Sequence, residues 1–372
     1  MRVALDVGSL VGPRTGIGVF THALAEALAS DPSVDLVGYA ATWRGRNELA
    51  TVVPANTTLA RRPMAARPLR ALWRRTDLAP IEWWTGPVDV VHGPNFVVPP
   101  ARKAAAVVSV HDLTMVHFPE MCTADTLAYP DLIRAALRRG AWVHTDTVAV
   151  AFEVTELFGA DPARVRCVPL APSPIPDADP ALGRRLAGAE RFILALGTVE
   201  PRKDLPGLVA AFDELASSDP TLRLVVAGPD GWGVEALTAA IDACSHRDRV
   251  VRLGWVDQAG RAALLRAATV LAYPSRYEGF GLPPLEAMSV GTPVVATDVP
   301  AVRETCGQGA RYVPAGDTEA LAEALAAVVN GGSDVDEQVA TGVARAAQFN
   351  WGATTEQLHL LYRDAISEQR TA

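Results

Sequence analysis

The stretch at residues 273–297, YPSRYEGFGLPPLEAMSVGTPVVAT, restricts what this chain can fold into more than any other segment. It follows an apolar run at 270–272, which predicts a buried strand that ends before a loop containing Gly279 and Gly281. A pair of prolines then suits the beginning of a helix over 285–290, and a second apolar run predicts another strand. Strand, glycine-rich loop, helix and strand form the repeating unit of a parallel α/β sheet.

Two glutamates, Glu278 and Glu286, lie on either side of this loop with seven residues between them. Small residues let backbone N–H groups come close to a bound oxyanion, and a helix N-terminus adds partial positive charge. Carboxylates beside such an anion accept hydrogen bonds from hydroxyl groups. The stretch therefore predicts a site for an anion that carries hydroxyls, such as a sugar nucleotide. The alternative is two exposed acids that flank a helix.

The length and composition of the chain fit a globular protein with two domains. It has 372 residues, of which 49% are hydrophobic and 20% are charged, and this exceeds one ordinary α/β core. The formal net charge of −8 disfavours nonspecific binding to nucleic acid. The four cysteines show no CxxC spacing and no zinc-like cluster, so we expect reduced thiols and a cytoplasmic location. We expect neither a membrane-spanning helix nor a signal peptide.

The N-terminal segment has the pattern of the first half of a Rossmann-like domain. Residues 2–7 predict a strand, the loop that follows contains Gly16 and Gly18, and a helix and a strand at 35–39 come next. The two glycines would let the loop approach a phosphate or an acceptor, although a tight turn explains them as well. They lack the third glycine of a dinucleotide fingerprint.

Two further strands are predicted within residues 88–110, and each runs into a polar loop. The first loop contains His92 and Asn95, and the second contains His111 and Asp112. Ligands gather at the carboxyl ends of strands in open α/β sheets, so both loops are candidates for contact with a substrate. For His92, Asn95 and His111, an ordinary strand-end turn is the alternative.

A proline-rich segment at 171–180 predicts a linker, because four prolines in ten residues disfavour regular structure. The alternation of strands and helices restarts after it, beginning with a strand at 192–196. We therefore expect an N-terminal domain at 1–171 and a C-terminal domain at 181–350. Each is predicted to be a doubly wound, Rossmann-like α/β domain, with a cleft between the two.

A basic stretch at 61–84 allows two interpretations. It combines six arginines with three tryptophans, and such a stretch can make peripheral contact with an anionic membrane surface. It can instead be a solvated helix whose aromatic residues pack on its own domain. Three prolines interrupt any long amphipathic helix, and this favours the second interpretation.

Four motifs follow one another along the chain: Gly16-Ile17-Gly18, His111-Asp112, Gly197-Thr198 with Arg202-Lys203, and the segment from Glu278 to Glu286. In this order they resemble the motifs of a retaining glycosyltransferase of the GT-B architecture, in the nucleotide-sugar family often called family 4. The last two motifs are specific together. The resemblance covers nearly the whole chain and implies that a final helix at 352–372 crosses back onto the N-terminal domain.

The resemblance also implies roles for individual residues. Arg202 and Lys203 would bind the diphosphate and stabilise the leaving group. Glu278 would bind hydroxyls of the transferred sugar, Glu286 the ribose hydroxyls, and His111 would approach the sugar from the N-terminal domain. The other expected donor contacts are Gly16, Gly18, Gly197, Thr198, Trp255, Val256, Gly279, Phe280, Gly281 and Leu282. The expected acceptor contacts are His92, Asn95 and Asp112.

The chain departs from the family pattern at two places. It has Thr-Asp-Thr-Val at 145–148, where family members commonly carry a serine-led segment, and Leu-Ala-Pro at 170–172, where many have Asn-Gly-Val. Those positions usually border the cleft, so acceptor contacts there are not carried over from the family.

The expected function is transfer of a hexose from a nucleoside diphosphate sugar, such as GDP-mannose or a UDP-hexose, to an acceptor hydroxyl in polysaccharide, glycolipid or glycoside biosynthesis. The family is assigned a front-face mechanism with retention, in which the enzyme supplies positioning and electrostatics. No DxD-like motif is present and the cationic pair can replace a metal, so we expect neither a metal nor another cofactor. The alternatives are a weakly active sugar-nucleotide-binding subunit and another GT-B enzyme such as an epimerase. Donor base, donor sugar, acceptor and oligomeric state stay open.

Overall fold

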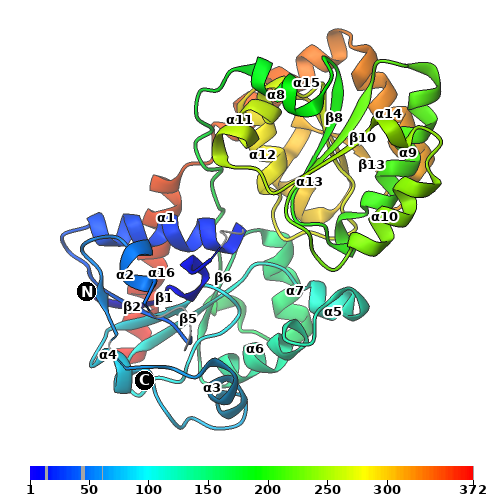
Figure 1. The fold of residues 1–372 in the computed structure, drawn as a ribbon. Coiled ribbons are helices and arrows are strands. Elements are labelled where there is room, and N and C mark those ends of the chain that lie inside the picture. Colours follow the sequence, from blue (N-terminus) through cyan, green and yellow to red (C-terminus); the bar gives the residue numbers. More distant parts are fainter. Residues whose placement is uncertain (13–15, 43–46, 61, 372) are drawn as a thin grey trace. The chain divides into compact units, whose positions relative to one another are not determined.

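The computed structural model describes residues 1–12, 16–42, 47–60 and 62–371. The chain divides into two compact units (Figure 1). Unit 1 comprises Met1–Ala171 together with Asn350–Ala372, and unit 2 comprises Pro172–Phe349. The C-terminal helix is therefore part of the same unit as the N-terminus. Over the described ranges, no helix is long and apolar enough to cross a membrane.

Unit 1 is built on a parallel sheet whose described strands lie in the order β3-β2-β1-β4-β5-β6-β7. The chain order reverses between β1 and β4, which is the arrangement of a doubly wound sheet. The residues at 3–5 of β1 are fully buried, as expected for a parallel sheet covered on both faces. The strands are β1 (Arg2–Asp6), β2 (Asp35–Tyr39), β3 (Thr58–Leu59), β4 (Val90–Gly93), β5 (Ala105–Val110), β6 (Trp142–Thr145) and β7 (Val165–Cys167).

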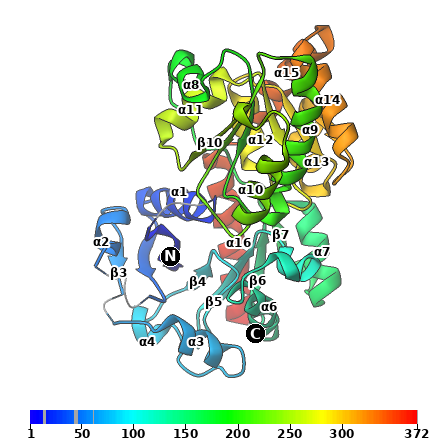
Figure 2. The same cartoon turned by 45° about the vertical axis from the view of Figure 1, so that its right-hand side comes forward.

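The helices of unit 1 include the C-terminal helix α16, which packs against β4, β5 and α1 (Figures 1 and 2). Its buried side chains, Leu358, Leu361, Tyr362 and Ala365, recur at helical spacing and form one stripe. The helices are α1 (Gly16–Ser30), α2 (Leu49–Val52), α3 (Ala66–Trp73), α4 (Glu82–Thr85), α5 (Thr114–His117), α6 (Tyr129–Arg138), α7 (Val148–Phe158) and α16 (Trp351–Thr371).

Unit 2 is built on a second parallel sheet, in which the strand order is β10-β9-β8-β11-β12-β13. The order reverses between β8 and β11, so these two central strands flank the switch point of the sheet. All five residues of β8 are buried, and this explains why the strand reads as a continuous apolar run. The strands are β8 (Phe192–Leu196), β9 (Arg223–Ala227), β10 (Val250–Gly254), β11 (Val270–Tyr273), β12 (Val294–Thr297) and β13 (Arg311–Val313).

The helices of unit 2 bury apolar stripes against this sheet. In α9, for example, Leu205, Leu208, Phe212 and Leu215 recur at helical spacing and belong to the core cluster. The helices are α8 (Pro180–Ala187), α9 (Leu205–Ser218), α10 (Val234–Ala243), α11 (Gln258–Ala267), α12 (Leu282–Ser289), α13 (Pro300–Cys306), α14 (Thr318–Asn330) and α15 (Ser333–Ala346).

Several elements differ from the sequence predictions. Helix α12 begins at Leu282 rather than at 285, because the two prolines occupy its first turn. The linker ends one residue earlier than predicted, since Asp179 caps α8 through its side chain and Pro180 starts the helix. No bounds were predicted for several elements, among them helices α2, α5, α7, α8, α13 and α15 and strands β3 and β13. In α7 the apolar residues occupy both the buried and the exposed face, which hides the helical period.

The segment at 61–84 forms two short helices, α3 and α4, rather than one long helix; residue 61 lies outside the described ranges. Trp73 is buried, and its indole nitrogen donates to the Ala79 carbonyl at 3.2 Å. Trp84 donates to the Pro63 carbonyl, whereas the Trp83 side chain is 49% exposed. Packing within unit 1 therefore accounts for Trp73, and Trp83 remains at the surface.

Candidate active site

Two basic side chains and a buried glutamate meet at the carboxyl ends of β8 and β11. These strands are neighbours in the sheet, so the segments that follow them emerge side by side. Arg202 and Lys203 lie in a 3₁₀ turn after β8, and Glu278 lies in the loop after β11. The Lys203 ammonium is 2.5 Å from Glu278 Oε1, and Arg202 Nη1 is 2.5 Å from Glu278 Oε2. Two predicted motifs that are distant in sequence are thus joined through one carboxylate.

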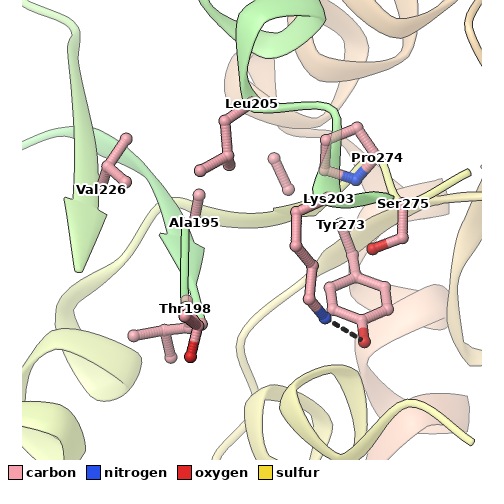
Figure 3. A pocket seen from close by; sticks show the side chains of 11 residues that line it. Ala195, Thr198, Lys203, Leu205, Val226, Tyr273, Pro274 and Ser275 are labelled. Atoms are coloured by element: carbon pink, nitrogen blue, oxygen red, sulfur yellow. Dashed lines mark hydrogen bonds between the residues drawn. The ribbon is translucent and has the colours of Figure 1, made fainter. Parts of the chain in front are cut away.

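The Lys203 side chain is also held by a tyrosine at the end of β11. Its ammonium donates to the Tyr273 hydroxyl at 3.0 Å and lies 4.5 Å from the centre of that ring (Figure 3). Gly197, Thr198 and Ser275 line a cavity of about 10 Å³ beside them, which is roughly the space that one water requires. The predicted residues Gly197, Thr198 and Lys203 therefore border one small cavity, whose lining is mostly apolar.

Burial and mutual charge set the ionisation of this cluster. Burial alone would raise the pKa of Glu278, but the charges of Arg202 and Lys203 outweigh it and lower that pKa to about 2. Burial lowers the pKa of Lys203, and the Glu278 carboxylate partly opposes this effect. Arg202 also donates to Glu200 at 3.0 Å. Two cations therefore share one carboxylate that stays ionised at neutral pH.

The glycine-rich loop leads directly into helix α12. Gly281 precedes the helix with a φ of 111°, a left-handed conformation in which a side chain would be strained. Phe280 is almost fully buried, and the residues before and after it, Gly279 and Gly281, have no side chains. The prolines of the first helical turn carry no N–H, so the donors at this helix start come from Leu282 and the loop before it. The segment suits recognition of an anion through backbone groups.

Glu286 occupies a separate place from Glu278, on the buried face of α12. Its side chain is 3% exposed, and both carboxylate oxygens accept hydrogen bonds from Arg261 of α11, one of them at 2.8 Å. Burial raises the pKa of Glu286, and the Arg261 charge opposes that shift. Arg261 was not predicted as a site residue, because its position on an ordinary helix gives no local signal.

The other predicted donor contacts lie further along the same edge of the sheet. The backbones after β8 and β9 approach so closely that a Cβ on Gly228 would lie 1.9 Å from the Gly197 carbonyl oxygen. Trp255 and Val256 follow β10, and β9 separates that strand from β8. The Trp255 side chain is 64% exposed. The structure does not bring Trp255 and Val256 into the cluster around Glu278.

In unit 1, His111 follows β5 and lies against an aspartate that follows the neighbouring strand β6. His111 Nδ1 is 2.7 Å from Asp146 Oδ2, and His111 Nε2 is 2.8 Å from the Pro94 carbonyl oxygen. The imidazole is largely buried, with the Phe20 ring edge-on to it at 5.2 Å. Burial lowers the pKa of His111, but the Asp146 carboxylate outweighs it, so the net shift is upward.

The three predicted acceptor residues have different surroundings. His92 is fully buried, and its two ring nitrogens are hydrogen bonded to Tyr362 and Ser109, which leaves neither nitrogen for an acceptor. The Asp112 carboxylate accepts from the backbone N–H of Thr114 and so supports the start of α5. Asn95 is half-buried in the loop after β4. The geometry therefore disfavours direct acceptor contact for His92, because the residue is an internal support of unit 1.

The predicted glycines of the first loop lie at the start of α1. Gly16 is the first residue of the helix and is exposed, whereas Gly18 is buried within the first turn. Residues 13–15, which complete this loop, lie outside the described ranges. Across the described part of the chain, no group of three His, Cys, Asp or Glu side chains is arranged to hold a metal ion.

Four residues at these sites escaped the sequence analysis: Glu200, Tyr273, Arg261 and Asp146. Asp146 and Tyr273 lie at strand ends, as the predicted residues do, so the same reasoning extended to every strand would have found them. Tyr273 directly follows the apolar run at 270–272, and no role was predicted for it. Asp146 belongs to the segment that departs from the family pattern.

Comparison with known sequences assigns the family. The profile described as "Glycosyl transferases group 1" matches residues 184–342. The O-antigen chain mannosyltransferase B of Escherichia coli is 30% identical over 283 residues, which cover 74% of each chain. A D-inositol 3-phosphate glycosyltransferase of Acidothermus cellulolyticus is 31% identical over 314 residues, 78% of this chain and 67% of that protein.

Solved structures show the same fold. WaaG, a glycosyltransferase involved in lipopolysaccharide biosynthesis, superposes with a TM-score of 0.75 at 18% identity, over 96% of this chain and 98% of that chain. A sucrose-phosphate synthase from Thermosynechococcus elongatus gives a TM-score of 0.75 at 19% identity, over 99% of both chains. These matches confirm the predicted GT-B fold with two Rossmann-like α/β domains. The sequence relatives, taken with this fold, establish that the chain is a glycosyltransferase and belongs to the glycosyl transferases group 1 family.

Proposed function

We propose that the protein transfers a hexose from a nucleoside diphosphate sugar to an acceptor hydroxyl, with retention at the anomeric carbon. The observation that carries the proposal is the contact of Arg202 and Lys203 with Glu278 at the ends of two neighbouring strands. A diphosphate is bound by cationic donors, and a hexose offers hydroxyls to a carboxylate. The cluster holds both kinds of group within reach of each other. The relative named as a mannosyltransferase supports mannose as the first sugar to test.

Donor binding would exchange partners within this cluster. Phosphate oxygens would replace Glu278 as the acceptors for Arg202 and Lys203, and the freed carboxylate would accept from sugar hydroxyls. Because the pKa of Glu278 is about 2 in the unliganded cluster, the group is ionised at neutral pH before the donor arrives. The exchange replaces each charge-assisted hydrogen bond with another, so no buried charge loses its partner.

In the transfer step, the bond between the anomeric carbon and the phosphate oxygen breaks while the bond to the acceptor oxygen forms on the same face of the sugar. The acceptor proton passes to a phosphate oxygen of the leaving nucleoside diphosphate. Arg202 and Lys203 would stabilise the negative charge that builds on that phosphate, which is where preorganised donors have their largest effect. Because these cations supply that charge, we also propose that the reaction needs no metal ion.

Glu286 would serve a different part of the donor. Its carboxylate lies in the second turn of α12 and is fixed by Arg261, so it would be a preorganised acceptor for the ribose hydroxyls. Burial raises the pKa of Glu286, and the Arg261 charge opposes that shift and so favours the ionised form. Glu286 would therefore contribute to donor affinity more than to the rate of transfer.

Nucleotide binding and donor turnover test the proposal together. GDP, UDP and ADP at equal concentrations should raise the melting temperature of the wild type in at least one case, because a ligand of the folded state stabilises it. Glu278→Gln should keep this shift and lose at least ~100-fold in release of nucleoside diphosphate from the matching sugar donor. Glu323→Gln changes an exposed glutamate on α14 and serves as the control.

Two results would contradict the proposal: no thermal shift with any nucleoside diphosphate, or unchanged turnover in Glu278→Gln. Retention is tested separately by the one-bond C1–H1 coupling constant of the product in NMR, which distinguishes the two anomers of mannose as well as those of glucose. An α-linked donor should give an α-linked product, and a β-linked product would show that the reaction inverts. If EDTA abolished turnover and manganese restored it, the proposal that the reaction needs no metal ion would be wrong.

A further inference from the structure

A line of buried polar side chains runs through unit 1 from the C-terminal helix toward His111, and the proposed transfer chemistry does not use it. Its members come from α16, β4, β5 and β6, and each is 0–2% exposed. The Tyr362 hydroxyl is 2.7 Å from His92 Nδ1, and His92 Nε2 is 2.8 Å from Ser109 Oγ. Ser109 Oγ is 2.8 Å from His144 Nδ1. Such a continuous buried network fixes the side chains that it joins.

The contact of His144 with a backbone carbonyl, at one end of this line, determines which atoms of the network carry the protons. His144 Nε2 is 3.0 Å from the Val168 carbonyl oxygen, which can only accept, so this nitrogen carries a proton. Burial lowers the pKa of both His92 and His144, so each ring carries a single proton. The Ser109 hydroxyl must then donate to His144 Nδ1 and accept from His92 Nε2. His92 Nδ1 in turn accepts from the Tyr362 hydroxyl.

His111 differs from these two histidines, because both of its partners are acceptors. Its Nδ1 faces the Asp146 carboxylate and its Nε2 faces the Pro94 carbonyl oxygen. Two hydrogen bonds to acceptors require two ring protons, so His111 is an imidazolium. The upward shift of its pKa, caused by Asp146 against the effect of burial, agrees with this geometry.

The surroundings of the His111 ring leave Asp146 as its main counter-charge. Phe20 of α1 and Phe96 of the loop after β4 both meet it edge-on, at 5.2 and 5.9 Å between ring centres. The His144 ring, 6.1 Å away, is neutral, and Asp112 is engaged at the start of α5. The titratable groups that face the ring are Asp112, Asp146, His92 and His144.

We propose that Asp146 is a positioning residue, which keeps His111 protonated on both ring nitrogens and fixes the plane of its ring. The inference rests on the proposed function, together with the role near the transferred sugar that the family resemblance implies for His111. With both N–H groups engaged by Asp146 and Pro94, His111 contributes a fixed positive charge and cannot serve as a general base, because its ring has no free lone pair. Asp146 lies in the segment 145–148, where this chain departs from the family pattern. The pairing of Asp146 with His111 is therefore not taken from that pattern.

Nitrogen-15 NMR of histidine-labelled protein tests the charge state directly. The chain has seven histidines, and the signals of His111 are identified by their loss in His111→Gln. At pH 7 both ring nitrogens of His111 should be protonated, whereas His92 and His144 should each carry one proton, on Nε2. Asp146→Asn should convert His111 to a singly protonated ring at the same pH. A neutral His111 in the wild type, or a doubly protonated one in Asp146→Asn, would overturn the proposal.

Kinetics then separates positioning from a purely structural role. Asp146→Asn should lower kcat ~10- to 100-fold with little change in the donor KM. The decline of kcat with rising pH should begin at a lower pH than in the wild type, because His111 loses its proton more easily. The matched control is Asp161→Asn, an exposed cap in unit 1, which should change neither kcat nor the profile. A wild-type pH profile in Asp146→Asn would also overturn the proposal.

The outcomes distinguish the proposal from the function on which it rests. Full activity in His111→Gln, with an imidazolium in the wild-type spectrum, would remove His111 from the transfer chemistry while its charge assignment stands. If Asp146→Asn does not fold, Asp146→Glu keeps the charge but displaces the carboxylate, and it should still lower kcat. Wild-type kinetics in that variant would count against the positioning role.

Discussion

Units 1 and 2 both place an acidic and a basic side chain in contact at the carboxyl ends of neighbouring parallel strands, but the two contacts are built differently. In unit 2, Glu278 binds Lys203, a long side chain that rotation can move to another acceptor. In unit 1, Asp146 binds His111, a short rigid ring whose second nitrogen is held by the Pro94 carbonyl. The comparison predicts that a ligand can replace Glu278 as the partner of Lys203 in unit 2, whereas the pair of Asp146 and His111 in unit 1 stays intact.

The largest effect is expected from Lys203→Ala, which removes half of the cationic pair in unit 2. Loss of one preorganised donor to a developing oxyanion typically costs ~100- to 1,000-fold in kcat, and release of nucleoside diphosphate from the donor should fall by that factor. Lys103→Ala changes an exposed lysine of unit 1 and is the control. If Lys203→Ala retained wild-type kcat, the exchangeable contact would have no part in transfer.

The two contacts should respond to pH in opposite directions. The folded pKa of Glu278 is about 2, below its ordinary 4.5, so its stabilisation is present above pH 4.5 and is lost as the pH falls toward 2. About 2 kcal/mol of that stabilisation should disappear between pH 6 and pH 3. The folded pKa of His111 is raised above 6.5, so its stabilisation is present below pH 6.5 and is lost as the pH rises through the folded value.

The urea concentration at which half of the protein is unfolded, measured at pH 3, 6 and 9, gives the loss of stability on both sides of pH 6. Glu278→Gln should reduce the acidic loss, between pH 6 and pH 3, and His111→Gln should reduce the alkaline loss, between pH 6 and pH 9. Neither variant should change the other loss, because the two groups lie in different units. The comparison would fail if a variant changed the loss assigned to the other group, or if it changed neither loss.

An effect on stability of the same size as the acidic loss is expected from Arg261→Met, which probes the second acid of unit 2. The change leaves the buried Glu286 carboxylate without its partner and should destabilise the protein by about 2 kcal/mol in urea unfolding. The donor KM should rise while kcat changes little, because Glu286 is proposed to bind the ribose. Arg266→Met, on the same helix, is the control and should cost no more than about 0.5 kcal/mol. A kcat loss as large as that of Lys203→Ala would place Glu286 in the transfer step instead.

Much of the sheet was predictable because buried parallel strands are continuous apolar runs. The strands predicted at 35–39 and 192–196 have these bounds in the structure. Helix α7 was missed because Val148 and Phe152 are apolar yet more than 60% exposed, which obscures the buried face. Its start depends on the Thr147 side chain, which accepts from the Val150 N–H.

By itself, the sequence determined the strand–loop–helix units, the family and the residue types suited to a diphosphate and a sugar, because these depend on local pattern. Tertiary structure alone decided the partners: Glu278 with Lys203, Glu286 with Arg261, and His111 with Asp146. Each pair joins residues at least 25 positions apart in the chain. Such contacts follow from strand order and helix packing, which nonlocal burial of apolar surface sets. The sequence thus identified Lys203, Glu278, Glu286 and His111, whereas the packed fold added Asp146 and Arg261 and established which acid neutralises which base.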